Sequence, residues 1–261
     1  MLDILFQSIL PFILSALIVI LITIIAEKFG TKAGGILGTL PSTIIIAFIF
    51  IALNRGVDFA SQSVAVVPAE MGINLIFLLI LVLLAYKSLS LALMVSLSVW
   101  TILSTALYLF DITNIFLSLT LFVLSMMATF GYLEFIKKIP STGKVIVHYT
   151  PLKIILRGVL TGVIISVSVL FSNISPSLSG IFSIFPAIMS STMIISVREH
   201  GPEFAAGMAK SMIFGCTSVM SYAVSIYFLY PRYGIIAGTL VAFFLSIVIT
   251  MVLLKLRKKI K

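Results

Sequence analysis

Long apolar stretches separated by short polar breaks run along almost the whole chain. A helix needs about 20 mostly apolar residues to cross the hydrocarbon core of a bilayer. Most breaks are short, the one longer linker covers 137–151, and no stretch leaves room for a soluble domain. Any binding site should therefore lie between helices. We expect nine membrane-spanning helices, over residues 4–27, 33–53, 59–86, 89–110, 115–136, 152–171, 178–197, 204–229 and 233–254.

Two segments of the chain repeat one pattern of glycine, proline and acidic residues. Residues 35–60 and 180–205 align without a gap at an offset of 145. Apolar residues match by chance in any membrane protein, whereas glycines, a proline and an acid in one register do so much less readily. The matched pairs are Gly35 and Gly180, Ile36 and Ile181, Pro41 and Pro186, Gly56 and Gly201, Asp58 and Glu203, Phe59 and Phe204, and Ala60 and Ala205.

The repeat predicts the organisation of the chain. We expect an all-α polytopic membrane protein in which one four-helix unit covers residues 1–110 and a second covers 152–261. A linking transmembrane helix at 111–137 and a linker at 138–151 would join them. One extra helix between the units turns the second upside down, and inverted repeats of this kind are common in secondary transporters.

The composition agrees with a membrane protein. Hydrophobic residues make up 61% of the chain and charged residues 10%, and the mean hydropathy is +1.29. A soluble domain carries about 25% charged residues, and disorder requires low hydrophobicity. A soluble enzyme, a nucleic-acid-binding module and a disordered chain are therefore excluded. The first apolar run lacks the basic start of a cleavable signal peptide and is too long for one, so we expect it to be retained.

The net charge of +9 comes mainly from two basic clusters, which predict the orientation. The positive-inside rule places both in the cytoplasm, and the even number of predicted spans between them agrees with this. We expect a multi-pass protein of the plasma or inner membrane with its N-terminus outside and its C-terminus cytoplasmic. The lipid bilayer is its expected partner, nucleic acid is not, and a homo-oligomer is compatible with the sequence. The clusters are Lys137, Lys138, Lys144, Lys153 and Arg157, and Lys255, Arg257, Lys258, Lys259 and Lys261.

The second helix of each unit is predicted to be broken. Pro41 and Pro186 each fall eight residues into a predicted span, close to Gly35 and Gly180. Proline removes one helical hydrogen bond and clashes with the preceding turn. One interpretation is a broken helix that lines a central site, and the other is a packing kink where glycine allows close helix approach. The hydroxyls that would line the site are Ser42, Thr43, Ser190, Ser191 and Thr192.

Glu70 and Lys210 are the charged residues deepest in the apolar runs. They lie roughly 18 Å and 10 Å along helices that enter from opposite sides, so both should reach a similar depth. An unpaired charge there costs at least about 2.5–3.5 kcal/mol. We consider a Glu70–Lys210 pair, or a coupling carboxylate beside an ammonium that binds substrate. The alternative for Lys210 is snorkelling to the membrane surface.

Other polar residues have simpler interpretations. Asp58 and Glu203 should begin the helix after each glycine turn, where an acid complements the helix dipole, and a gate or ion-binding role is the alternative. Glu134 lies one turn from Lys137 and Lys138, which predicts a surface ion pair. Trp100 is interpreted as a packing or interface anchor, and Cys216, the single cysteine, as a structural residue.

Signatures of catalysis are missing from the sequence. There is no Gly-x-Ser-x-Gly, no His-Glu-x-x-His and no phosphate-binding glycine loop. His200 beside Glu199 and Glu203 is only a weak metal signal. We therefore expect no enzyme, no catalytic residue, no cofactor and no metal.

The second half resembles the GlpM family of small bacterial inner-membrane proteins. The resemblance is carried by residues 180–186, 212–215 and 225–229 and covers roughly 155–255, whereas the first half matches through 35–41 only. Members are about half as long as this chain and have four predicted helices. The resemblance implies a four-helix unit that can stand alone, here duplicated and fused. It also implies a loose link to envelope polysaccharide production, and it carries over no functional residues.

Together these features favour a secondary-type transporter or exporter of a small polar or anionic solute. Its site would lie between the second and third helices of each unit. The alternative is a non-transporting integral membrane protein that supports envelope lipid or polysaccharide machinery. A membrane-embedded enzyme is the third and least supported class.

Overall fold

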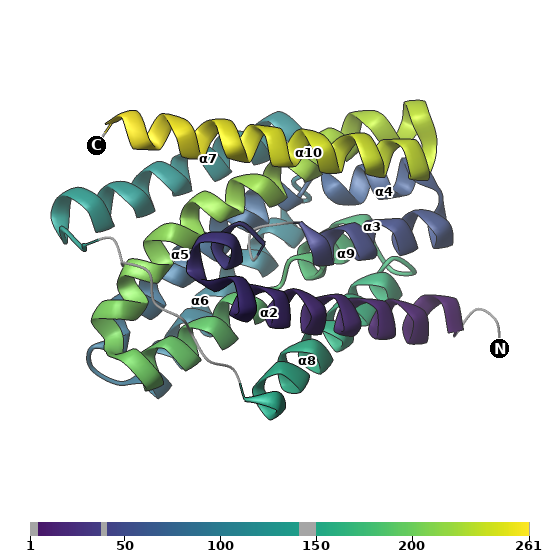
Figure 1. Ribbon diagram of the computed structural model, residues 1–261. Coiled ribbons are helices and arrows are strands. Elements are labelled where there is room, and N and C mark those ends of the chain that lie inside the picture. Colours follow the sequence, from purple (N-terminus) through teal and green to yellow (C-terminus); the bar gives the residue numbers. More distant parts are fainter. Residues whose placement is uncertain (1–4, 38–40, 141–149, 261) are drawn as a thin grey trace.

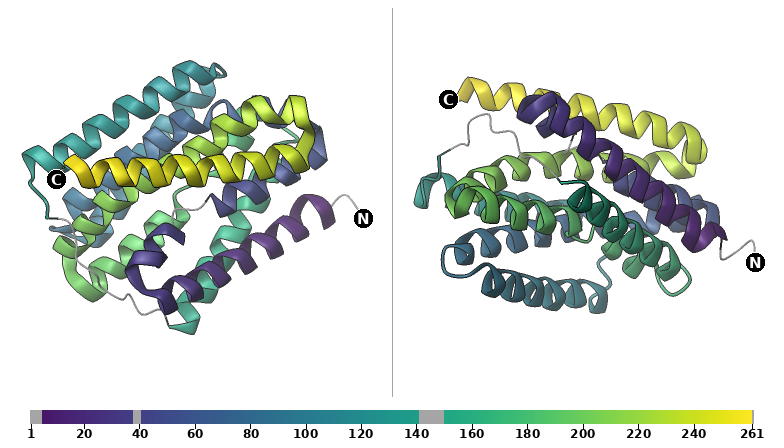
Figure 2. Two further views of the ribbon diagram at one scale, coloured as in Figure 1. Left: turned by 45° about the horizontal axis from the view of Figure 1, so that its top comes forward. Right: turned by 60° about the horizontal axis from the view of Figure 1, so that its bottom comes forward.

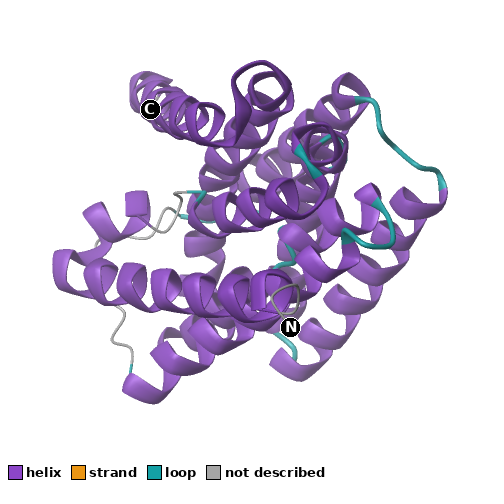
Figure 3. Ribbon diagram, turned by 90° about the vertical axis from the view of Figure 1, so that its right-hand side faces the viewer, coloured by secondary structure: helices purple, strands orange, loops and turns teal. Residues whose placement is uncertain are grey.

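The computed structural model describes residues 5–37, 41–140 and 150–260, and it describes side-chain surroundings for 7–25, 41–140 and 150–252. Throughout these residues the regular structure is helical (Figures 1 and 3). The elements are the π-helical turn η1 (Leu5–Ile9), α2 (Leu10–Leu37), α3 (Ser42–Arg55), α4 (Val57–Val64), α5 (Val67–Ala85), α6 (Leu89–Leu109), α7 (Ile115–Gly131), the π-helical turn η2 (Tyr132–Ile136), α8 (Pro151–Phe171), α9 (Pro176–Ser183) and α10 (Ala187–Ile260).

The helices have the length and composition of membrane spans. Within the described residues, six helical segments are long and apolar enough to cross a membrane, and α3 is a shorter apolar helix. The prediction of an all-helical, multi-pass membrane protein is confirmed at this level. The six segments are Gln7–Ile25, Val57–Ala85, Leu89–Leu109, Ile115–Ile136, Pro151–Phe171 and Pro176–Val252.

The longest helix, α10, consists of three stretches that meet at sharp kinks. Gly201 has φ 86° and ψ 168°, and Gly234 has φ 72° and ψ −174°, so neither is helical. Only glycine adopts such angles readily, because it has no Cβ. The chain folds back at each kink, so each stretch runs roughly antiparallel to the one before it (Figure 1, green to yellow).

The same local conformations recur at the offset of 145 residues. Gly56, between α3 and α4, has φ 88° and ψ 165°, almost the values of Gly201. Helix α3 begins at Ser42, directly after Pro41, and α10 begins at Ala187, directly after Pro186. The predicted glycine turns and the helix starts that follow the prolines are therefore present in both halves.

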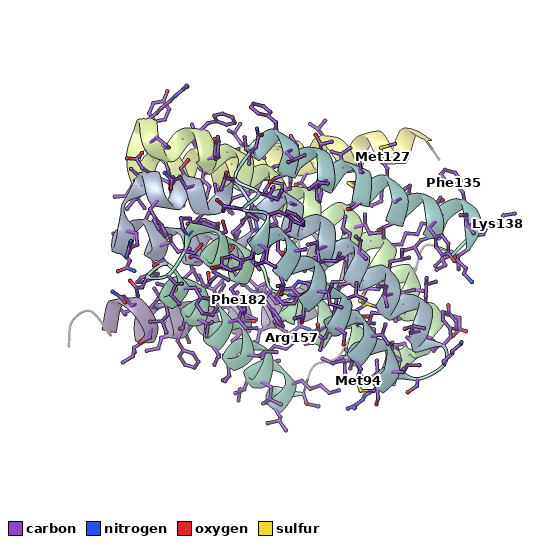
Figure 4. The ribbon with its side chains drawn as sticks, turned by 180° about the vertical axis from the view of Figure 1, so that it is seen from behind. Met94, Met127, Phe135, Lys138, Arg157 and Phe182 are labelled. Atoms are coloured by element: carbon purple, nitrogen blue, oxygen red, sulfur yellow. The ribbon has the colours of Figure 1, made fainter. Side chains whose placement is uncertain are left out.

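Helix α5 lies at the centre of the bundle. It packs against α6, α7 and α10. In the continuous span Val57–Ala85, which α5 forms together with α4, 78% of the most apolar 18 residues are buried. Only 22% of the corresponding windows of α6 and α7 is buried. Their outward side chains, such as Met94 and Met127, and Phe135 of η2 are apolar and exposed (Figure 4), as a surface facing lipid tails requires.

The two ends of the chain lie at opposite ends of the bundle (Figure 1). We call these the N end and the C end of the molecule. Helices α2 and α8, far apart in sequence, lie side by side (Figure 2). Gly158 and Gly162 of α8 allow this, because a Cβ at either position would lie 2.7 Å from an atom of α2.

Candidate functional site

The break between α9 and α10 is the centre of the candidate site. Helix α9 ends at Ser183, Ile184 and Phe185 are not helical, and Pro186 precedes the first turn of α10. Pro186 is buried, and its carbonyl accepts from the Ser190 N–H at 2.8 Å. The break leaves the Ile184 carbonyl without a helical partner. Inside a membrane such a group must find a partner within the protein.

That partner comes from α5. The Asn74 side-chain amide donates to the Ile184 carbonyl at 2.8 Å, and its oxygen accepts from Trp100 Nε1 of α6 at 3.0 Å. Trp100 in turn packs edge-on against Phe185, with ring centroids 4.8 Å apart. An asparagine and a tryptophan from two neighbouring helices therefore hold the broken segment.

A buried carboxyl group lies one turn from Asn74 on the same face of α5, since residues four apart are neighbours on a helix. Glu70 is 0% exposed, and its Oε1 accepts from Ser104 Oγ of α6 at 2.8 Å. Ser104 is likewise one turn from Trp100. We call Glu70, Asn74, Trp100, Ser104 and the Ile184 carbonyl the central cluster.

The second oxygen of Glu70 is unusual. Among the described residues, Oε2 is buried and has no hydrogen-bond partner. An ionised carboxylate left this way is costly, whereas a neutral acid needs fewer partners and can itself donate. The cluster can therefore bind a proton or exchange it with a neighbouring group.

Lys210 does not pair with Glu70, so that hypothesis is wrong. Its ammonium donates to the Ile139 carbonyl at 2.8 Å and forms an ion pair with Glu134 of η2. The predicted pairing of Glu134 with Lys137 or Lys138 is replaced by this contact. Lys210 is only 2% exposed, so it does not snorkel to the surface either. The end of a helix offers carbonyls without helical partners, which attract a cation.

The five predicted hydroxyls are all half-buried and gather at the starts of α3 and α10. Ser42 and Thr43 form the first turn of α3. The Ser190 and Ser191 hydroxyls donate to the carbonyls of Pro186 and Ile188, about one turn earlier, at 2.7 and 3.1 Å. Thr192 instead accepts from Arg157 Nη1 of α8 at 3.0 Å.

Arg157 was missed as a site residue, because the sequence argument counted it among the basic residues that set the orientation. It is the seventh residue of α8 and only 9% exposed (Figure 4). The available signal was its position inside a predicted span with no acid nearby in the sequence. Asn74 was missed too, although it lies four residues from Glu70. Trp100 was interpreted only as an anchor.

The predicted glycine and proline positions differ in what surrounds them. A Cβ on Gly180 would lie 2.0 Å from the Ser63 carbonyl, so α9 and α4 meet backbone to backbone there. Pro41 is buried, and its carbonyl accepts from the Ile45 N–H at 3.1 Å. Gly35 belongs to the last turns of α2, and its surroundings lie outside the described residues, as does the segment 38–40 just before Pro41.

The two predicted gate residues lie on the surface. Asp58 is in the first turn of α4, and Glu203 follows the Gly201 kink by two residues. Both side chains are exposed. Their positions agree with the prediction that each begins the helix after a glycine turn.

Polar contacts hold the bundle together at both ends. At the N end, Gln7 Nε2 donates to Asn54 Oδ1 at 2.8 Å, and Asn54 Nδ2 donates to Ser172 Oγ at 2.8 Å. Asn173 Nδ2 closes this amide network by donating to Gln7 Oε1 at 2.9 Å. At the C end, Lys153 of α8 and Glu199 of α10 form an ion pair.

Comparisons with known proteins add one family. A model described as a protein of unknown function (DUF3147) matches residues 8–114, which run from η1 to the turn before α7. No curated protein matches the chain, and no solved structure does. The matched family covers the first half, whereas the GlpM-like resemblance concerns the second half and stays a prediction.

Proposed function

We propose that the protein is a secondary-type transporter or exporter of a small polar or anionic solute. The observation that carries this proposal is the helix break at 184–186 beside the buried Glu70 and Asn74. In secondary transporters, discontinuous helices form substrate and ion sites because their ends supply unpaired backbone groups. The proposal requires neither a cofactor nor covalent chemistry.

The proposed architecture is two inverted four-helix units with nine spans. Three observations support it. The glycine turns and the helix starts after proline recur at an offset of 145 residues. The family model ends at residue 114, close to the proposed end of the first unit at 110. The chain termini lie at opposite ends of the bundle (Figure 1), as an odd number of spans requires.

In this proposal, Arg157 and the half-buried hydroxyls at the start of α10 contact the solute. A guanidinium presents a planar fork of donors that fits a carboxylate or phosphate, which explains the preference for an anion. Asp58 and Glu203 lie where the pathway would open to either side. The N end would face the cell exterior and the C end the cytoplasm of a plasma or inner membrane.

Cysteine accessibility tests the proposal without knowledge of the solute. The single native Cys216 is buried and would be replaced by alanine. A cysteine at Ser190 should react with a membrane-impermeant maleimide, from a side that depends on the imposed proton gradient. A cysteine at the exposed Ile102 of α6 is the control, because lipid should protect it from either side. No reaction at Ser190 from either side would contradict the transporter.

A second test measures flux directly. Labelled acetate, phosphate and glycerol would be offered to liposomes that contain the full chain, with and without a proton gradient. We expect saturable flux of at least one probe, dependent on the gradient and lowered at least about tenfold by Arg157→Gln, equivalent to about 1.4 kcal/mol. Flux no greater than in empty liposomes for every probe would count against transport.

One observation favours the alternative, a non-transporting protein that supports envelope machinery. Gly180 packs so closely on α4 that this crossing leaves no space for a side chain. A rigid bundle without internal water would have helix crossings as close as this one throughout. The maleimide test separates the two functions, because a scaffold would protect Ser190 in every condition.

A further inference from the structure

We propose that Glu70 takes up and releases one proton, and that this proton is the coupling ion of the transport cycle. The second statement rests on the proposed function, whereas the first concerns the central cluster alone.

The hydrogen bonds of Glu70 fit a neutral acid in the described conformation. Ser104 supplies one donor to Oε1, and Oε2 has no partner among the described residues. An ionised carboxylate can accept about four hydrogen bonds and would lack most of them here. To become charged, Glu70 needs water or new donors.

Among the residues whose side chains the structure describes, no neighbouring charge offsets ionisation of Glu70. Helices α6, α7 and α9 carry no charged residue. Helix α5 carries Glu70 alone, and the acid of α4, Asp58, is exposed at the far end of that helix. Helix α10 carries charged residues around its two kinks, at 198–203 and at Arg232, and a basic last turn. Between the kinks it carries Lys210, whose ammonium is bound by Glu134 and the Ile139 carbonyl. The charge of Glu70 is therefore controlled by access to water.

The cluster fits a proton better than a metal cation. A bound metal ion needs several oxygen ligands at once. The other two acceptor oxygens of the cluster already accept hydrogen bonds, Asn74 Oδ1 from Trp100 and the Ile184 carbonyl from Asn74. A proton needs only one free carboxyl oxygen, and Glu70 Oε2 is such an oxygen.

Proton release would act directly on the broken helix. When the proton leaves to water on the side to which the site is open, the carboxylate requires donors. Asn74, one turn away, carries an amide donor that currently holds the Ile184 carbonyl. If this amide turns to the carboxylate, the link between α9 and α10 loses its partner and is free to move. The charge of Glu70 is thereby coupled to the conformation of the break.

The chain contains its own reporter for this inference. Trp100 is the single tryptophan, and its indole N–H bonds to Asn74. In the full protein reconstituted in liposomes, we expect tryptophan emission to follow a one-proton titration curve. Glu70→Gln should abolish the curve. Asp111→Asn is the matched control, because Asp111 is an exposed carboxyl bonded by Ser177, and it should leave the curve unchanged.

Several outcomes would overturn the inference. One is a tryptophan emission of the native chain that does not change with pH. Another is a pH titration of the emission that persists in Glu70→Gln. The emission could also respond saturably to sodium chloride but not to choline chloride, with the response lost in Glu70→Gln. That result would mean that Glu70 binds a metal cation instead of a proton. Glu70→Asp should retain a titration, which shows that loss of the curve in Glu70→Gln is not a folding defect.

This experiment separates the two proposals. A titration of Glu70 without flux of any probe would keep the proton site and remove the transporter. Flux that depends on a proton gradient, in a protein whose emission does not titrate, would keep the transporter and remove Glu70 as the coupling residue.

Discussion

Lys210 shows how this chain places a charge inside an apolar bundle. Its ammonium reaches the Glu134 carboxylate in η2 and the Ile139 carbonyl in the segment that follows η2. A pair of this kind gives little net stability relative to well-packed apolar residues, yet removing one partner is costly because the other is left without a partner. The contact therefore links η2 to α10, and its loss should be felt mainly through the partner that is left behind.

A double-mutant cycle tests this contact. Lys210→Met and Glu134→Gln should each lower the free energy of unfolding in detergent, and the double variant should lose less than the sum. We expect an interaction energy of about 0.5–3 kcal/mol. The control cycle combines Lys210→Met with Glu70→Gln, which share no partner and should be additive within about 0.5 kcal/mol. Additive effects of Lys210→Met and Glu134→Gln, with coupled effects of Lys210→Met and Glu70→Gln, would instead support a Glu70–Lys210 pair.

Gly180 carries a prediction of its own. A Cβ there would lie 2.0 Å from the Ser63 carbonyl, so Gly180→Ala must push α9 away from α4. Overpacking of this kind costs about 1–3 kcal/mol, and we expect a lower thermal midpoint in detergent. Gly131→Ala is the control, because a Cβ at Gly131 has nothing within 4 Å. Equal midpoints for the two variants would show that the crossing is not tight.

At the scale of elements, the most regular feature is the pair of glycine corners that end α3 and the first stretch of α10. Each reverses the chain within one residue, at φ 88° for Gly56 and 86° for Gly201. At this φ with extended ψ, residues with a Cβ are strained. A Cβ on Gly56 would have nothing within 4 Å, so the backbone conformation alone requires glycine there.

Replacing either corner glycine should therefore have the same effect. Gly56→Ala and Gly201→Ala should each destabilise by about 1–3 kcal/mol, seen as similar decreases in the thermal midpoint. Gly131→Ala, at φ −58°, again serves as reference. If Gly56→Ala left the thermal midpoint unchanged and Gly201→Ala lowered it, the two corners would not be equivalent.

Several element boundaries were predictable from the sequence, because an apolar run in a membrane protein ends where polar residues begin. The predicted break at 28–32 is wrong, however, because α2 continues from Leu10 to Leu37. The predicted spans 89–110 and 152–171 correspond to α6 (Leu89–Leu109) and α8 (Pro151–Phe171). The span 59–86 was predicted as one helix but is divided into α4 and α5 around Ala65 and Val66. Nothing in the apolar composition marks that division except Pro68, the second residue of α5.

Contacts between helices were much less predictable. Spacing along a helix gives the depth of Glu70 and Lys210 but not the direction in which either points across the bundle. The Asn74–Trp100 and Arg157–Thr192 contacts join residues 26 and 35 positions apart, and such pairing depends on how the helices rotate against one another. A single sequence carries no record of that rotation.

The whole molecule has its two termini at opposite ends (Figure 1). With the proposed orientation, a fluorescent protein fused after Lys261 should fold in the cytoplasm and fluoresce. An epitope tag before Met1 should bind antibody added outside intact spheroplasts. Antibody binding to the N-terminal tag only after the cells are permeabilised would contradict the proposed topology, and permeabilised cells supply the control for tag expression.

The neutral amide network of Gln7, Asn54 and Asn173 has a consequence for the behaviour of the protein in different solutions. Uncharged hydrogen bonds respond little to added electrolyte, whereas dissolved ions screen a solvent-accessible contact such as Lys153 with Glu199. Raising the ionic strength should therefore weaken the ion pair at the C end and leave the amide network at the N end unchanged. Under the proposed function, the bundle would therefore open more easily on the side of the C end at high ionic strength.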